Sequence, residues 1–123
     1  MKKMLLFVAM AVLLLPGCRK STPRPYQNEI AISRALERAI ELSEKIISED
    51  ELIENVALTQ GTDAALKLHD SIGYRDHVNL LWEEVGQIEK LCNQVTDTLA
   101  RKEIFAHLYP YAARLDELLD QIY

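Results

Sequence analysis

The apolar and polar residues of this chain follow a helical period from residue 29 onward. The pattern is clearest from Glu29 to Ser48, where apolar side chains recur at three- and four-residue steps and polar side chains fill the opposite face. The apolar positions of this stretch are Ile32, Leu36, Ala39, Ile40, Ile46 and Ile47. Such spacing predicts a helix with one face against a core. No part of residues 29–123 shows the alternation of a strand, so the pattern predicts an all-α fold.

Two shorter helices are expected next. Residues 48–51, Ser-Glu-Asp-Glu, have the form of a capping box, which predicts that the first helix ends at Ser48 and that a second helix begins there. Gly61 then predicts a stop, with Thr62 as the cap of a third helix over about 63–72. These two short segments could instead form one kinked helix.

The longest apolar seam predicts a helix over about 77–99. Its members alternate spacings of three and four residues: Val78, Leu81, Val85, Ile88, Cys92, Val95 and Leu99. A seam of this length is typical of a bundle helix, and it is equally compatible with a helical dimer. Cys92 occupies a seam position, which favours an inert core residue over a redox or interchain thiol. Gly86 within the helix could let a neighbouring helix approach closely.

A last helical segment is expected over residues 101–123. Pro110 interrupts it, either at the first turn of a new helix or as a kink in a continuous one. The chain is long enough for one domain with one modest core. The sequence therefore predicts a small antiparallel bundle of four or five helices over residues 29–123.

The N-terminal residues have a different pattern. Lys2 and Lys3 precede an unbroken apolar run from Met4 to Leu15. Twelve residues in a helix cover roughly 18 Å, which is short of a hydrocarbon core of about 30 Å. The run therefore predicts a secretory signal peptide rather than a membrane-spanning helix.

The apolar run ends in Leu15-Pro16-Gly17-Cys18, and this stretch resembles the cleavage site of bacterial lipoproteins. In that family a leucine stands three positions before a cysteine that becomes the first residue after cleavage. The resemblance implies a cleaved signal peptide over 1–17 and durable membrane anchoring through acyl chains on Cys18. Arg19 stands where an aspartate retains such proteins in the inner membrane, so the resemblance implies the periplasmic face of the outer membrane.

The composition behind the signal peptide is acidic. Residues 18–28 predict a short tether, because Pro23 and Pro25 stand in a stretch without apolar periodicity. Residues 18–123 keep 12 of the 14 basic side chains and all 19 acidic ones, a formal charge of −7. Nucleic-acid binding relies on clustered lysine and arginine, so we expect no nucleic-acid partner.

No catalytic or metal-binding pattern is present in the sequence. His69, His77 and His107 do not stand at the spacing that puts two metal ligands on one helix face. There is no Gly-x-Ser-x-Gly, no phosphate-cradling glycine loop and no Cys-x-x-Cys. We therefore expect a protein that is not an enzyme and that holds no cofactor or metal.

Aromatic residues are the best candidates for a binding surface. The candidates are Tyr109, Tyr111 and Phe105, with Trp82 as a further contributor. Aromatic side chains concentrate binding energy in protein interfaces, but they also fill cores. Core packing is the stronger expectation for Phe105 and Trp82, whereas Tyr109 and Tyr111 are open.

These features predict a lipid-anchored protein that binds a protein partner in the cell envelope. The first hypothesis is an adaptor or assembly factor, by analogy of size, anchor and helicity with the pilotin lipoproteins that escort secretins to the outer membrane. The second is an immunity or entry/superinfection-exclusion lipoprotein that neutralises an envelope-acting protein, because an acidic body favours docking onto a basic toxin. A structural envelope lipoprotein is a third alternative, and the oligomeric state is left open.

Overall fold

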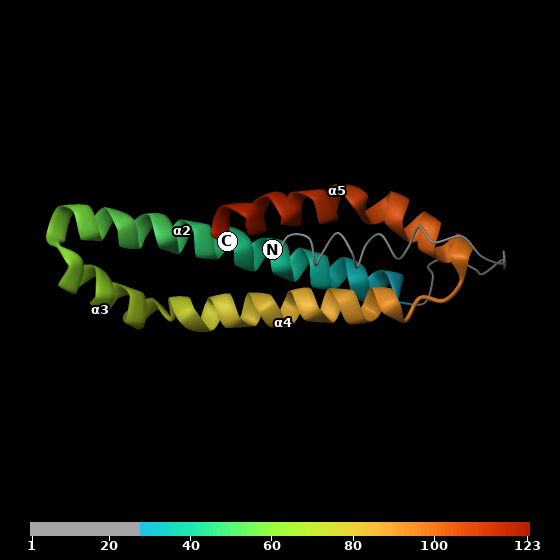
Figure 1. Ribbon diagram of the computed structural model, residues 1–123, viewed down its shortest axis with the longest axis horizontal. Coiled ribbons are helices and arrows are strands. Elements are labelled where there is room, and N and C mark those ends of the chain that lie inside the picture. Colours follow the sequence, from blue (N-terminus) through green and yellow to red (C-terminus); the bar gives the residue numbers. More distant parts are fainter. Residues whose placement is uncertain (1–27) are drawn as a thin grey trace.

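Helix α2 (Glu29–Gln60) is the longest element, and the other helices pack on it. The computed structural model describes residues 28–123, in which α2 is followed by α3 (Thr62–Ile72), α4 (Tyr74–Asn93) and α5 (Thr98–Ile122). Helices α3 and α4 run back along α2, and α5 then runs in the direction of α2 on its other side (Figure 1). The described residues contain four helices and no strand, so the predicted all-α bundle is confirmed.

The apolar core lies where α2, α4 and α5 meet. Its largest fully buried side chains come from all three helices: Ile32, Leu36, Ile46, Leu81, Val85, Ile88, Cys92, Ile104, Leu115 and Leu119. Burying one such large apolar side chain stabilises the fold by about 1.5–3 kcal/mol. The predicted burial of Cys92 is confirmed. This burial, and secondarily the charge of Glu89, raises the pKa of the Cys92 thiol to about 12.

The predicted break at Ser48 is wrong, because α2 continues through it to Gln60. No glycine or proline stands within α2, so nothing stops the helix before Gly61, which has a φ of 95°. Ile46 is buried and Ile53, seven residues later on the same face, is half-buried. The apolar face therefore continues through the capping-box residues. Gly61, not Thr62, is the N-cap of α3.

The predicted seam helix is too long at its C-terminal end. Helix α4 ends at Asn93, and Val95 is buried in the connection that follows. Asp97 caps α5: its Oδ1 accepts hydrogen bonds from the backbone N–H of Leu99 at 2.9 Å and of Ala100 at 3.4 Å. Such a cap fixes the start of a helix, so the end of the predicted seam belongs to α5.

Pro110 and Gly86, two residues of types that disfavour a helix interior, both lie inside helices. Pro110 stands within a continuous α5. The proline removes the N–H that would bond to the carbonyl of Ala106, and both residues are exposed, so water can satisfy that carbonyl. The expected close approach at Gly86 is wrong, because a Cβ at this exposed position would meet nothing within 4 Å.

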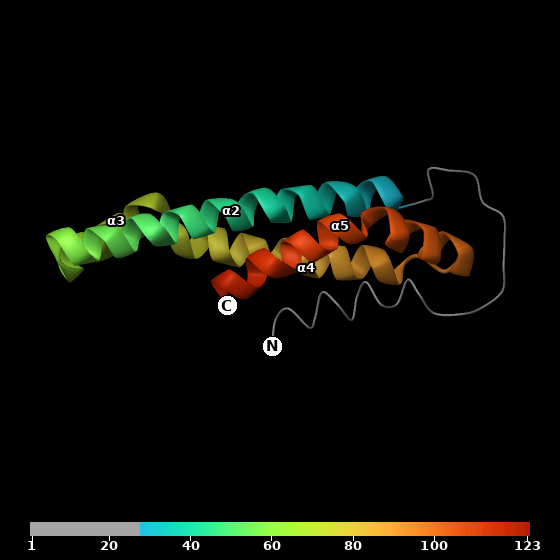
Figure 2. The ribbon, with the colours of Figure 1, turned by 90° about the horizontal axis from the view of Figure 1, so that it is seen from above.

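The molecule divides into two regions along α2. Helix α5 ends about midway along α2, as Figures 1 and 2 show. We call the part that α5 covers the three-helix region, and residues 49–76 the distal arm. Only Ala65 is buried within the distal arm.

In the described part of the chain, no helix has the length and apolar content needed to cross a membrane.

Candidate functional site

The predicted lipidation site lies outside the described residues. Cys18 and the predicted signal peptide over 1–17 both precede residue 28, so cleavage and lipid attachment stay predictions. Asn28, where the predicted tether ends, has a left-handed φ of 72° and makes no side-chain cap. Its side-chain amide instead donates to Oε1 of Gln94 at 3.3 Å, which ties the start of α2 to the α4–α5 connection. The tether therefore joins the bundle at the end opposite the distal arm.

The predicted aromatic surface is divided on α5. Phe105 and Tyr109 are one helical turn apart, with ring centroids 5.4 Å from each other. Phe105 packs against the core, whereas Tyr109 is 49% exposed. Tyr111 is 47% exposed, but two residues correspond to about 200° around a helix, so it lies on the opposite flank of α5.

Trp82 belongs to a separate contact between α4 and the end of α5. Its ring lies 5.2 Å from the ring of Tyr123, between centroids, and the Trp82 side chain is half-buried. Burial, and then the nearby Tyr74, raises the pKa of Tyr123. The structure thus does not bring the four predicted aromatic residues together, and their role in partner binding stays a prediction.

Each histidine lies beside one carboxylate. The Nδ1 distances are 2.7 Å from His77 to Glu49, 3.3 Å from His69 to Asp70 and 3.7 Å from His107 to Glu29. The first of these contacts links α4 to α2 at the base of the distal arm. Over residues 28–123, no three potential ligands gather where they could hold a metal ion.

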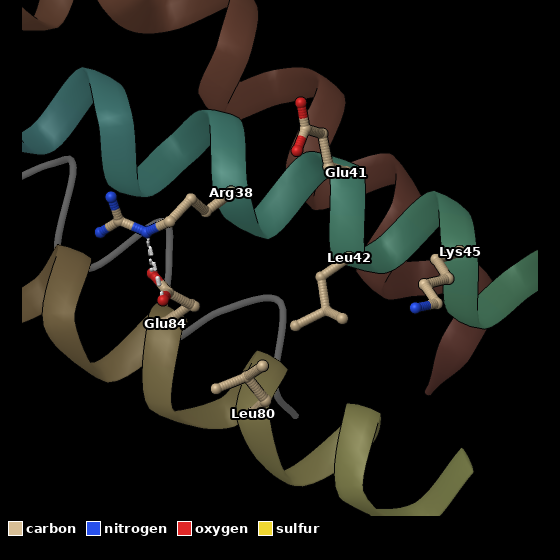
Figure 3. A pocket seen from close by; sticks show the side chains of 6 residues that line it. All are labelled: Arg38, Glu41, Leu42, Lys45, Leu80 and Glu84. Carbon is tan, nitrogen blue, oxygen red and sulfur yellow. Dashed lines mark hydrogen bonds and ion pairs between the residues drawn. The ribbon is translucent and has the colours of Figure 1, made fainter. Parts of the chain in front are cut away.

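A shallow groove of about 260 Å³ lies between α2 and α4. Figure 3 shows Leu42 and Leu80 pointing into it from the two facing helices. Arg38 closes one end, because its Nε donates to both carboxylate oxygens of Glu84 at 3.2 Å. Small-molecule sites usually enclose about 300–1,000 Å³ and place a few polar groups around the ligand. This groove is smaller and open, and Arg38 and Glu84 at its end pair with each other, so it is a poor small-molecule site.

The most exposed large apolar side chains lie on the distal arm. Leu58 of α2 is 80% exposed and Leu66 of α3 is 58% exposed. The sequence analysis singled out neither leucine, because both lie outside the predicted core positions and the predicted binding residues were aromatic. The sequence did contain a signal, because large apolar residues outside the core positions of a helix indicate an interaction surface.

Comparison with known proteins adds no assignment. No protein-family model, no curated protein and no solved structure matches this chain. The function therefore has to be argued from the surface of the bundle and from the N-terminal sequence.

Proposed function

We propose that this protein is a lipid-anchored adaptor of the bacterial cell envelope, which acts by binding a protein partner in the manner of the pilotin lipoproteins. The observation that carries the binding role is the exposure of Leu58 and Leu66 on an arm with a single buried residue. Apolar surface that the fold leaves uncovered in this way is typical of protein interaction sites.

The anchor in this proposal rests on the sequence Leu15-Pro16-Gly17-Cys18 and on Arg19, which favours the outer membrane. Labelling of cells with radioactive palmitate tests it. The wild-type chain should take up label and sediment with outer-membrane fractions, whereas Cys18→Ser should take up none. Label on the Cys18→Ser variant would contradict the assignment of Cys18.

The adaptor role is tested by mild cross-linking of intact cells at native expression, followed by purification and mass spectrometry. The expected partner is a component of an envelope assembly. A form with Cys18→Ser and an ordinary signal peptide should still fold but should no longer deliver that partner to the membrane. Normal partner localisation in cells that carry only this soluble form would contradict the adaptor role.

A second candidate is an immunity or exclusion lipoprotein, which the charge of the distal arm favours. Residues 49–76 contain seven acidic residues and two basic ones, Lys67 and Arg75. A surface of this sign attracts a basic toxin and speeds its association. Recovery of a basic toxin, or of a conjugation or phage component, would favour this candidate over the adaptor. Protection by the soluble form would support it further.

A further inference from the structure

One face of α2 carries α5 in the three-helix region. Ile47 and Glu51 of α2 line a common pocket with Leu118 of α5. Glu44, on the same face, lies with its Oε2 3.6 Å from Nη2 of Arg114. Steps of three and four residues keep side chains on one helix face, so positions 44, 47 and 51 mark the α5-packing face of α2.

The α5-packing face continues beyond the end of α5. After Glu51, the same steps reach Glu54 and then Leu58, and both are exposed. Within residues 28–123, no helix covers this continuation (Figure 1). The exposure of Leu58 therefore comes from its position about two helical turns beyond Glu51, past the end of α5.

Helix α3 presents an apolar residue to the same side of the molecule. Leu66 shares a helix face with His69, whose ring lies 5.1 Å from the ring of Tyr74. Tyr74 in turn lies near Tyr123, the residue that follows α5. Leu66 thus faces the side on which α5 ends. We call the surface between Leu58 and Leu66, in line with α5, the distal slot.

The rim of the distal slot is acidic. Glu51 and Glu54 precede Leu58 on the α5-packing face, Asp50 stands next to Glu51, and Asp70 stands one turn after Leu66 on α3; all four are exposed. Apolar side chains with carboxylates around them complement an amphipathic helix whose apolar face is flanked by lysine or arginine.

We propose that the distal slot binds a basic amphipathic helix of the envelope partner, in the position that α5 occupies along the rest of α2. The slot extends from about Glu51 to Gln60, which is about 15 Å of helix and fits a partner segment of about three turns. This binding mode rests on the proposed function, because it supplies the surface through which the adaptor holds its partner.

Two other occupants fit the slot less well. A second copy of the chain would bring acidic rims together, and like charges repel. The chain's own basic tether joins at Asn28, and Arg19 stands nine residues before it. Nine extended residues span about 30 Å, whereas about 44 Å of helix separate Glu29 from Leu58. The tether is therefore too short to bring Arg19 to the middle of the slot.

Site-specific photo-cross-linking tests the slot in the full-length chain in its own cells. A photoreactive phenylalanine replaces Leu58 or Leu66 in the slot, and Ile30 or Leu80 as controls in the three-helix region. The controls are 50% and 45% exposed, against 80% for Leu58 and 58% for Leu66, so all four side chains reach the surface. Both slot positions should give an adduct with the same heterologous protein, at a segment whose helical apolar face is flanked by basic residues. Both control positions should give at least about tenfold less of that adduct.

The charge of the rim is tested with a peptide that carries the cross-linked segment. Its affinity for the purified lipidated protein is measured by fluorescence anisotropy. Glu54→Lys should weaken binding about tenfold or more, whereas Glu37→Lys, an exposed charge reversal on α2 in the three-helix region, should change it less than about twofold. Both sites are exposed on one helix, so unchanged circular dichroism should show that both variants fold. Equal effects of the two reversals would overturn the role of the acidic rim.

The cross-linking outcomes separate the slot from the proposed function. Adducts with the partner from Ile30 or Leu80 but not from the slot would overturn the slot and leave the adaptor role standing. Adducts between two copies of the chain from Leu58 and Leu66 would overturn the partner helix in favour of self-association. No adduct from any of the four positions would overturn both proposals.

Discussion

The three-helix region and the distal arm share helix α2, but they bury very different parts of it. In the three-helix region, Ile32, Leu36 and Ile46 are fully buried. In the distal arm, Leu58 of the same helix is 80% exposed. Leu58 continues the face of α2 on which α5 packs, but α5 ends before it and leaves it uncovered. The comparison teaches that the exposure of Leu58 reflects the length of a neighbouring helix rather than a local change in sequence.

The two regions should also differ in local stability. A region with few buried apolar contacts opens with a smaller free energy than a packed core. In the distal arm, α3 packs mainly on α2 and contributes only Ala65 to the buried residues. Helices α4 and α5 contribute most of the buried core instead. A bound partner helix would therefore stabilise the arm more than the rest of the molecule.

The largest expected effect comes from truncating matched leucines in the two regions. Leu36→Ala should lower the free energy of unfolding by about 3 kcal/mol, because Leu36 is fully buried. Leu66→Ala should lower it by less than about 0.5 kcal/mol, because Leu66 already faces water. Urea unfolding followed by circular dichroism measures both. Equal losses would mean that the arm is packed as tightly as the three-helix region.

Two glycine substitutions should have opposite signs. Gly61, at the tip of the distal arm, has a φ of 95° and a ψ of 169°, a conformation that costs an alanine about 1–3 kcal/mol. Gly61→Ala should therefore speed amide hydrogen exchange in α3 by about tenfold or more. Gly86→Ala should stabilise α4 by up to about 1 kcal/mol, because the added Cβ meets nothing within 4 Å and alanine favours a helix. Slower exchange in α3 after Gly61→Ala would contradict the strained turn.

Stability should fall in alkali because of Cys92. The pKa of its thiol is about 12 in the folded protein against 9.0 for the ordinary group. The stabilisation that the buried, protonated thiol gives to the fold is therefore complete below pH 9, and it is lost as pH rises towards 12. At pH 10 the wild type should have lost about 1 kcal/mol more than Cys92→Ala, as urea unfolding measures.

Thiol labelling sharpens the contrast between the regions. A maleimide should label Leu58→Cys in the distal arm rapidly and leave Cys92 unlabelled until the protein unfolds. Fast labelling of Cys92 in the folded protein would contradict its place in the core.

The smallest expected effect concerns the ion pair across the α2–α4 groove. Arg38 and Glu84 lie 3.2 Å apart, and the Arg38 side chain is about half exposed. Pairs of this kind contribute about 0–1 kcal/mol. Arg38→Ala should cost less than about 0.5 kcal/mol in urea unfolding, and salt should erase the difference. A larger cost would mean that the groove contributes to the stability of the three-helix region.

Much of the fold was predictable because its signals are local in the sequence. The helical period identified the buried faces around Ile32 and Ile88, and the seam correctly placed Cys92 in the core. The break at Ser48 was predicted wrongly because a capping box is also an acceptable helix interior, and only tertiary packing decides between them. Asp97 is a preferred cap residue, but the regular seam around it favoured a continuous helix instead.

The candidate site was much less predictable. The aromatic residues Tyr109 and Tyr111 drew attention by type, and the structure places them on opposite flanks of α5. Whether Leu58 and Leu66 are buried depends on how far α5 extends along α2, and that distance follows from packing between segments about 60 residues apart. The positions of Leu58 and Leu66 outside the predicted core were a local signal, but no local pattern encodes the reach of α5, so the distal slot became visible only in the three-dimensional arrangement.

The unbroken course of α2 gives the molecule a mechanical property. Its 32 residues span about 48 Å without a glycine or proline, so the helix has no built-in hinge. A tilt of about 10° at Glu29 would displace Gln60 by about 8 Å over that length. The helix thus acts as a lever, because small rotations near the tether become large movements at the tip. Orientation of the base therefore sets where in space the tip, and whatever it carries, is delivered.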